Sequence, residues 1–352
     1  MAGTGKAAEN GILVKSGEAL QNLAAINAVV LDKTGTITYG VPEVAGLAFS
    51  QNISESEFLG LAAAVERRSS HVLGKPIVKL ADEKGIPDAE VGGFKAVAGE
   101  GVAAEVGGKA CLVGNARLLK DNGIELKEYA DRFGEDCTVI HVALSGEHIG
   151  SIAVKDGIKP SSRAAAESFR RMGVKTVMLT GDGEKAARAV AEEIGTEYKA
   201  EVMPDDKFRE IRKLKESGAK VMMVGDGVND APALAEADVG AAIGAGTDVA
   251  IESADVVLIK SDLNDAAAAV KLGRKVMINI KENLFWAFFY NIILIPVACG
   301  ALYPVAGLTL NPMFAAAAMS LSSVFVVTNA LRLRFFRYER TQKEKTAKII
   351  DD

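Results

Sequence analysis

Short aliphatic runs and amphipathic helical patterns alternate along much of the chain. Three runs end at loops rich in glycine, aspartate and threonine: Ala28 to Leu31, Val174 to Leu179 and Lys220 to Val224. Such runs are typical of strands buried on both faces of a parallel sheet. Helical patterns followed by glycine lie over Pro160 to Gly173, Glu184 to Ile194 and Asp205 to Ser217. The alternation predicts an α/β fold with a doubly wound parallel sheet.

A different pattern interrupts this sheet. It contains helical segments at Ser54 to Arg68 and Leu73 to Lys84, and short alternating strands such as Gly101 to Val106. This segment, residues 42–153, is large enough to have its own core. We expect a helical connector, a discontinuous α/β domain and an inserted α+β domain: residues 1–23, residues 24–41 with 154–270, and residues 42–153.

Two apolar stretches near the end of the chain have the length of membrane spans. Leu284 to Tyr303 and Pro312 to Leu331 each contain 20 residues without a charge, and a helix of that length crosses about 30 Å of hydrocarbon. The flanking segments are basic and the loop between them is not: Lys271, Arg274, Lys275 and Lys281 precede the pair, and Arg332, Arg334, Arg337 and Arg340 follow it. The positive-inside rule places both ends, and the basic tail over residues 332–352, in the cytoplasm. Two buried core helices are the alternative.

Composition excludes several classes of protein. The formal net charge of −5 argues against nucleic acid as a partner. The three cysteines, Cys111, Cys137 and Cys299, form no CxxC pair. This argues against a disulfide framework and a structural zinc site, and suits a reducing compartment.

The candidate chemistry is concentrated where the first buried run ends. Asp32 follows Leu31 directly, and ligands of open α/β sheets bind at the carboxyl ends of the strands. A carboxylate there can attack a phosphoryl group, while Lys33 and the amides around Gly35 receive the anion. Thr34 stands where simple phosphatases with such a loop have a second aspartate as general acid and base. We therefore expect a covalent phosphate on Asp32 to persist.

Two further strands bring acidic loops to the same edge of the predicted sheet. The loop at Thr180 to Asp182 follows one strand, and the loop at Asp226 to Asp230 follows the other. Carboxylates gathered beside a phosphate require a cation, and Mg²⁺ is suited to carboxylate and phosphate oxygens.

The string from Asp32 to Thr38 resembles the phosphorylation motif of the P-type ATPases, ion pumps with a haloacid-dehalogenase-like core. Three more motifs follow in that family's order: Thr180-Gly181-Asp182, Pro204-Asp205-Asp206-Lys207 and Gly225 to Pro232. The resemblance implies that Asp32 accepts the γ-phosphoryl group of ATP. It also implies Mg²⁺ ligation by the Asp32 carboxylate, the Thr34 carbonyl and Asp226, with Asp230 behind them. The rest of the implied catalytic set is Lys33, Thr180 as a phosphate ligand, Lys207 neutralising the transition state, Gly181, Asp182 and Asn229.

Residues of the inserted segment resemble the nucleotide-binding domain of the heavy-metal pumps. That subgroup has a Ser-Glu-His-Pro motif, whereas this chain has Ser69-Ser70-His71-Val72. The resemblance implies an adenine site, in which glycines let the purine lie against bare backbone. The implied residues are Glu66, His71, Gly99, Gly101, Gly114 and Asn115. His141 and His148, beside a predicted turn at Ser145-Gly146, are expected to be ordinary surface residues.

Polar residues within the apolar stretches are candidates for a transport site. Tyr290 and Asn291 lie in the first stretch, and Met319 and Ser323 are one helical turn apart in the second. Their pattern resembles the copper-transporting subgroup, and a thioether suits Cu⁺. Without a family, Ala315 to Ser323 would more simply form a small-residue packing face. The resemblance places the paired cysteines of the copper site upstream of Met1.

Together these features predict the carboxy-terminal, catalytic half of a Cu⁺-exporting ATPase in the cell membrane, with its soluble domains in the cytoplasm. The resemblance implies that the actuator domain and the earlier membrane helices belong to a missing half or a complementary chain. The expected partners are ATP, Cu⁺ with Ag⁺ as an alternative, and the lipid bilayer. A membrane-anchored phosphatase of the same core fold and a non-catalytic nucleotide-binding subunit remain alternatives.

Overall fold

The computed structural model describes residues 2–69, 71, 73–97, 99–129, 132–134, 136–226, 230–244, 252–299 and 312–336. The chain divides into two compact units. The first contains Met1–Ile37, Pro160–Gly181 and Ile194–Asp352, and the second contains Thr38–Lys159 and Asp182–Glu193. Each unit has its own sheet, so the two are described separately.

The sheet of the first unit has seven strands, and all of its pairings are parallel except that of β1. Their order is β1 (Ile12–Val14), β13 (Val256–Leu258), β12 (Val239–Ile243), β11 (Val221–Gly225), β2 (Ala28–Asp32), β9 (Lys175–Leu179) and β10 (Glu197–Lys199). Every residue of β2 and β11 is buried, as their continuous apolar runs predict. The predicted α/β fold is confirmed.

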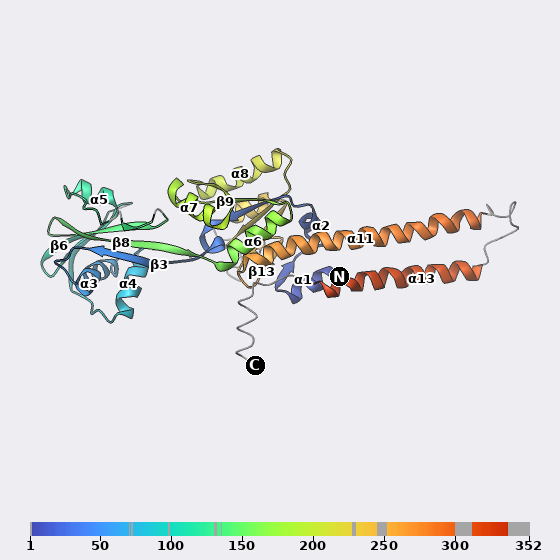
Figure 1. The fold of residues 1–352 in the computed structure, drawn as a ribbon, viewed down its shortest axis with the longest axis horizontal. Coiled ribbons are helices and arrows are strands. Elements are labelled where there is room, and N and C mark those ends of the chain that lie inside the picture. Colours follow the sequence, from blue (N-terminus) through green and yellow to red (C-terminus); the bar gives the residue numbers. More distant parts are fainter. Residues whose placement is uncertain are drawn as a thin grey trace. The chain divides into compact units, whose positions relative to one another are not determined.

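Helices cover this sheet and end where the sequence predicts. They include α1 (Ala2–Glu9), α2 (Gly17–Ala25), α6 (Pro160–Arg171), α8 (Pro204–Glu216) and α9 (Ala231–Glu236) (Figure 1). Gly173 and Gly218 follow two of them with φ of 70° and 89°, a conformation that glycine adopts at low cost. Ile211 of α8 and Leu234 of α9 pack on Val30 and Met223, forming the core beneath the central strands.

The second unit is built on a six-stranded antiparallel sheet. Its order is β3 (Thr38–Phe49), β8 (Glu147–Ile158), β7 (Thr138–Leu144), β6 (Lys109–Gly114), β5 (Gly101–Val106) and β4 (Val91–Val97). Helices α3 (Glu55–Glu66) and α4 (Gly74–Glu83) cover one face, and α5 (Ala116–Asp121) lies on the other (Figure 1). Helix α7 (Glu184–Ile194) groups with this unit up to Glu193. Phe58, Ile77 and Ile152 are fully buried in its main core.

The prediction that His141 and His148 are surface residues is wrong, because their exposed fractions are only 5% and 0%. The predicted turn is present between β7 and β8, but both rings are buried. Both rings contact the Ser151 Oγ, at 3.0 and 3.2 Å, and the Tyr129 ring packs edge-on against His148. The position of a residue beside a turn therefore did not determine its burial.

The first unit ends in two long helices, α11 (Leu263–Ala298) and α13 (Pro312–Leu331), followed by the short helix η3 (Arg332–Phe335) (Figure 1). The early part of α11 is buried against α2 and α6. Its later part is apolar and exposed, and α11 is long and apolar enough to cross a membrane by length and composition. Its most apolar window is 0% buried, which argues against a soluble core helix. Helix α13 has the predicted bounds, whereas residues 300–311 lie outside the described residues.

Candidate functional site

Asp32 is the last residue of β2 and is only 6% exposed. The parallel neighbours β9 and β11 end beside it, since Asp32 pairs with Leu179 and Leu31 pairs with Val224. This register brings the loops that begin at Thr180 and Asp226 to the edge where Asp32 lies. The run of apolar residues that buries β2 therefore also fixes the depth of its terminal carboxylate.

A buried lysine joins two of these carboxylates. The Lys207 Nζ, from the first turn of α8, lies 2.5 Å from the Asp32 Oδ1 and 2.7 Å from the Asp230 Oδ1. All three side chains are less than a tenth exposed. Charge-assisted hydrogen bonds in such surroundings are strong and hold the Asp32 carboxylate in one orientation.

The charges of this cluster do not balance. Burial and the neighbouring Asp230 raise the pKa of Asp32 to about 6, although Lys207 opposes the shift. Burial likewise raises the pKa of Asp230. Asp226 raises both values. Lys207 thus faces the carboxyl groups of Asp32 and Asp230 with Asp226 nearby, and a divalent cation would relieve the repulsion among the carboxyl groups.

Backbone geometry keeps the loops close together. Gly35 has φ of 74°, and a Cβ placed on it would lie 3.7 Å from the Asp226 Cβ. A Cβ on Gly225 would lie 2.4 Å from the Asp230 Oδ2, so any side chain there would displace that carboxylate. The Thr36 Oγ1 is buried without a hydrogen-bond partner among the described residues. Thr36 lies within the motif, but the sequence gives it no separate role.

The donor set fits Mg²⁺. Among the described residues, no group of three or more His, Cys, Asp or Glu side chains has the arrangement of a metal site. Mg²⁺ does not require one, because it binds through one or two carboxylates together with phosphate and water. Asp32, Asp226 and the nearby Thr34 backbone could supply the protein's share.

The other predicted catalytic residues are divided between the two units, and one of them lies outside the described residues. Thr180 is 2% exposed at the end of β9, and Lys33 is half-buried in the segment after Asp32. Asp182 groups with the second unit, whereas Gly181 belongs to the first. Asn229 lies outside the described residues.

The second unit contains a cavity of about 670 Å³, within the usual range for ligand pockets. All six residues of the predicted adenine site line it: Glu66, His71, Gly99, Gly101, Gly114 and Asn115. Gly101 and Gly114 lie where β5 and β6 approach closely, and a Cβ on either would come within 2.3 Å of a backbone oxygen. A side chain at either position would collide with the neighbouring strand, so only glycine fits. The glycines leave bare backbone along this wall of the cavity.

Glu66 is the most unusual group in this cavity. It is 7% exposed, and its Oε2 has no hydrogen-bond partner among the described residues. Burial raises the pKa of Glu66 to about 7, with a smaller opposing effect from Ser69. A Cβ on Gly74 would lie 2.2 Å from this oxygen, so Gly74 makes room for it. Glu66 thus lines the cavity with a carboxyl group whose Oε2 is buried beside Gly74 and unpaired among the described residues.

The remaining cavity residues have structural as well as binding potential. Asn115 caps α5 by accepting from the Leu118 amide at 3.1 Å, and its amide group donates to the Gly99 carbonyl at 2.9 Å. His71 is exposed, and its Nδ1 accepts from the Leu73 amide at 3.3 Å. Phe94 of β4 also lines the cavity and is 38% exposed. The sequence does not single out Phe94, because an aromatic residue within a strand gives no signal of its own.

Residues 26–238, more than half of the chain, match the haloacid dehalogenase-like hydrolase family model. The chain belongs to this family. Over 339 residues, 95% of its length, it is 49% identical to the copper-transporting ATPase 2 of Rhizobium meliloti (strain 1021). The chain spans 41% of that relative's length. The predicted resemblance to the P-type ATPases is confirmed.

Solved structures agree with this assignment within the family. A zinc-transporting PIB-type ATPase in its E2.Pi state superposes with a TM-score of 0.79 at 35% identity, covering 94% of this chain and 54% of that one. The catalytic domain of the CPx-ATPase CopB-B, in a study of nucleotide binding, has a TM-score of 0.62 at 33% identity. That comparison covers 76% of this chain and 98% of the domain.

The described residues do not test the predicted membrane metal site. Tyr290 is half-buried on α11, and the Asn291 side chain donates to the Ala287 carbonyl of its own helix at 2.9 Å. Ser323 is exposed on α13. Met319 lies on α13, but its side chain is outside the described set. The four residues therefore stay a prediction.

Proposed function

We propose that this chain is the catalytic, carboxy-terminal part of a Cu⁺-exporting P-type ATPase and that ATP phosphorylates Asp32. The observation that supports this most strongly is the Asp32 carboxylate, buried at a strand end and held by Lys207 with no acid at position 34. A nucleophile oriented in this way suits in-line attack, and Thr34 leaves the product without a general base.

The transfer conserves charge and atoms. An Asp32 carboxylate oxygen forms a bond to the γ-phosphorus, the bond from that phosphorus to the β,γ-bridging oxygen breaks, and ADP leaves with the electron pair. Lys207 neutralises charge that develops on the transferred group, and Thr180 and the Lys33 segment contact its oxygens. Bound Mg²⁺, held by Asp32, Asp226 and the Thr34 carbonyl, would supply further electrostatic stabilisation. Asp230 orients Lys207, and Gly181, Asp182 and Asn229 complete the set by resemblance.

ATP would occupy the cavity of the second unit through its adenine. The unsatisfied Glu66 Oε2 can accept from the exocyclic amine, and His71 can orient the ring. Gly99, Gly101, Gly114 and Asn115 form the wall, and Phe94 adds an aromatic face. The domain limits proposed for this function are residues 24–41 with 154–270 for phosphorylation and residues 42–153 for nucleotide binding.

The transported ion would be Cu⁺, with both ends of the membrane hairpin in the cytoplasm. Helices α11 and α13 would span the cell membrane, and Tyr290, Asn291, Met319 and Ser323 would contribute soft and polar ligands from them. Copper transport by the curated relative supports this choice. Stimulation of phosphorylation by Cu⁺, compared with Ag⁺ and Zn²⁺, tests the ion in a pump restored with the remaining membrane helices.

The deciding experiment uses γ-labelled Mg-ATP. We expect an acid-stable, hydroxylamine-labile label on the chain that is absent from D32N. D121N, which changes an exposed aspartate at the end of α5, is the matched control and should label normally. Absence of label from the unaltered chain would overturn the proposal.

Two alternatives give different results in the same assay. A membrane-anchored phosphatase would release phosphate steadily from p-nitrophenyl phosphate without a trapped intermediate. A non-catalytic subunit would bind ATP without any label.

A further inference from the structure

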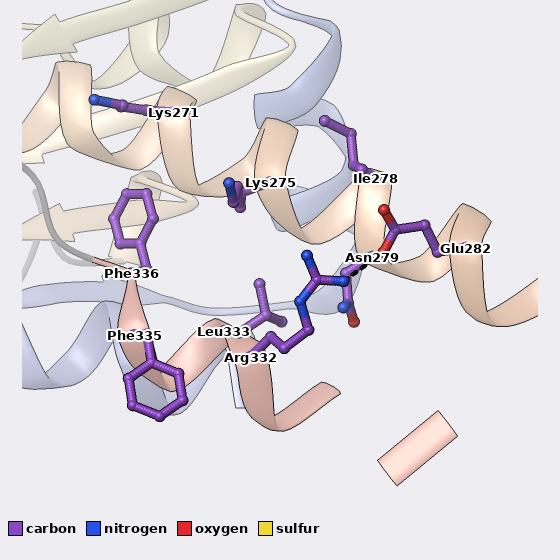
Figure 2. Close-up of a pocket in the computed structure, with 9 residues that line it drawn as sticks. All are labelled: Lys271, Lys275, Ile278, Asn279, Glu282, Arg332, Leu333, Phe335 and Phe336. Carbon is purple, nitrogen blue, oxygen red and sulfur yellow. Dashed lines mark hydrogen bonds and ion pairs between the residues drawn. The ribbon is translucent and has the colours of Figure 1, made fainter. Parts of the chain in front are cut away.

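A second pocket, of about 480 Å³, lies between α11 and η3 in the first unit (Figure 2). It combines basic with apolar side chains: Lys271, Lys275, Ile278, Asn279, Glu282, Arg332, Leu333, Phe335 and Phe336. None of these residues has a part in phosphorylation or nucleotide binding. The pocket therefore needs an explanation of its own.

Two lysines give the pocket an unbalanced positive charge. Lys271 and Lys275 are exposed and lie one turn apart on α11, so their charges repel each other. Neither amino group forms an ion pair with any carboxylate in the described part of the chain. The third cation, Arg332, is already engaged, since it lies 3.4 Å from Glu282 and 2.8 Å from the Asn329 Oδ1. Within the described residues, the two lysines thus give the pocket an excess of positive charge.

The position of the pocket along α11 can be compared with the start of the proposed membrane span. Asn279 donates to the Asn329 carbonyl at 2.8 Å, which places these two residues at one level. Past this level α11 has exposed apolar side chains at Ile280 and from Leu284 onward, with the exposed Lys281 between them. Lys275 lies one turn, about 6 Å, to the other side of Asn279, and Lys271 about 12 Å. Because a headgroup layer is roughly 5–8 Å thick, Lys275 falls within it, whereas Lys271 lies about 4 Å beyond it.

Apolar side chains complete the pocket at the same level. Leu333 and Phe336 are buried against it, whereas Phe335 is 83% exposed and points away from α11 (Figure 2). Exposed aromatic rings beside a membrane span are typical of the interface. A site with two free ammonium groups and an adjacent apolar surface suits an amphiphilic anion better than free phosphate.

We propose that this pocket binds the headgroup of an anionic membrane phospholipid, with the phosphate at Lys275, the charge of Lys271 adding attraction from beyond the headgroup layer, and an acyl chain along Phe335. The inference rests on the membrane location proposed above for α11 and α13. A lipid held there would contact both α11, which packs on α2 and α6, and η3, which follows α13.

The test is native mass spectrometry of the full chain in a neutral detergent, titrated with phosphatidylglycerol or phosphatidylcholine. We expect one saturable phosphatidylglycerol and much weaker phosphatidylcholine binding. Each lysine contributes modestly to attraction of an anionic lipid, so K271A/K275A should weaken binding by about 30-fold. K271R/K275R should retain it. K281A, which removes an exposed lysine of α11 outside the pocket, is the matched control and should bind as the unaltered chain does.

Three results would overturn the proposal: equal binding of both lipids, equal loss in K281A and the double variant, or displacement by millimolar inorganic phosphate, which would indicate a site for soluble anions. Labelling of Asp32 is measured on the same preparations. Lipid binding without labelling would refute the proposed function alone, and labelling without lipid selectivity would refute only this inference.

Discussion

At the scale of single residues, Asp32, Lys207 and Asp230 form a buried charged cluster in which two carboxyl groups share one ammonium group. The carboxylate oxygens lie 2.5 and 2.7 Å from it, and removal of that group leaves both carboxylates without their counter-charge. Asp226 adds a third negative charge nearby. The arrangement favours binding of cations and phosphate over stability.

We predict that K207M lowers the free energy of unfolding of the first unit by about 3 kcal/mol, as expected when one partner of a buried ion pair is lost. It should also slow labelling of Asp32 by about 100-fold, because a positioned cation is lost. K213M, on the exposed side of the same helix, should change neither. Urea unfolding and quenched-flow labelling measure the two effects. Normal labelling of K207M would contradict the role given to the lysine.

Glu66 gives a second prediction at this scale, and its sign follows from its pKa. In the unfolded chain the carboxyl group ionises near pH 4.5, whereas in the folded chain burial delays ionisation until about pH 7. The folded state is therefore favoured by proton binding at low pH and loses up to about 3 kcal/mol of stability as pH rises from 4.5 through 7.

Replacement of Glu66 by glutamine should remove that loss. At pH 8 we expect E66Q to protect the amides of β5 and β6 from hydrogen exchange more strongly than the unaltered chain, with no difference near pH 4.5. ATP affinity should fall, since the amide cannot match a carboxylate as an acceptor. E105Q, an exposed glutamate on β5, serves as the control. Equal protection at both pH values would show that Glu66 is ionised in the folded state.

At the scale of elements, the sequence predicts those features that depend on local pattern. Apolar runs as continuous as Val29 to Leu31 leave few alternatives to a buried parallel strand. The edge strand β1 was not predicted, because its pairing with β13 joins residues more than 240 positions apart and its three residues have no distinctive pattern. The cavity glycines were found by resemblance, but their steric reason, close approach of β5 and β6, became visible only in three dimensions.

The two buried histidines of β7 and β8 show the same limit and give a prediction for the element. Burial lowers the pKa of His141 to about 4 and also lowers that of His148. Above pH 6.5 both folded and unfolded states hold neutral rings. As pH falls from 6.5 towards 4 only the unfolded state gains protons, so His141 alone costs about 3 kcal/mol of stability over that interval.

We therefore expect amide protection of β7 and β8 to fall between pH 6.5 and 4.5. The variant H141N, which keeps a polar partner for Ser151 but cannot titrate, should flatten this dependence. H71N, which alters an exposed histidine of the same unit, should leave it unchanged. An unaltered pH profile in H141N would mean that another group governs stability in this range.

At the scale of the whole molecule, α11 connects the first unit to an exposed apolar helix. Its first part is buried against α2 and α6, and its later part has an exposed apolar surface that is long enough to cross a membrane. Where the two parts meet, Asn329 of α13 links the helices. Its amide donates to the Asn283 Oδ1 at 2.9 Å and to Glu282 at 3.2 Å, and its backbone carbonyl accepts from Asn279. Hydrogen bonds at this level fix the pairing of the two helices, because apolar contacts in lipid provide little discrimination.

Replacement of Asn329 by leucine should therefore loosen the pairing of α11 and α13 without disturbing the phosphorylation site. Glu282 and Asn283 would lose a donor, and each such hydrogen bond contributes about 1 kcal/mol in a membrane protein. We expect N329L to lower the melting temperature of the chain in detergent while labelling of Asp32 continues, and T328L, at the adjacent exposed position, to melt as the unaltered chain does. If N329L abolished labelling as well, the junction would have to act on Asp32 through α11, and the two regions of the unit would be coupled more tightly than the hydrogen bonds alone imply.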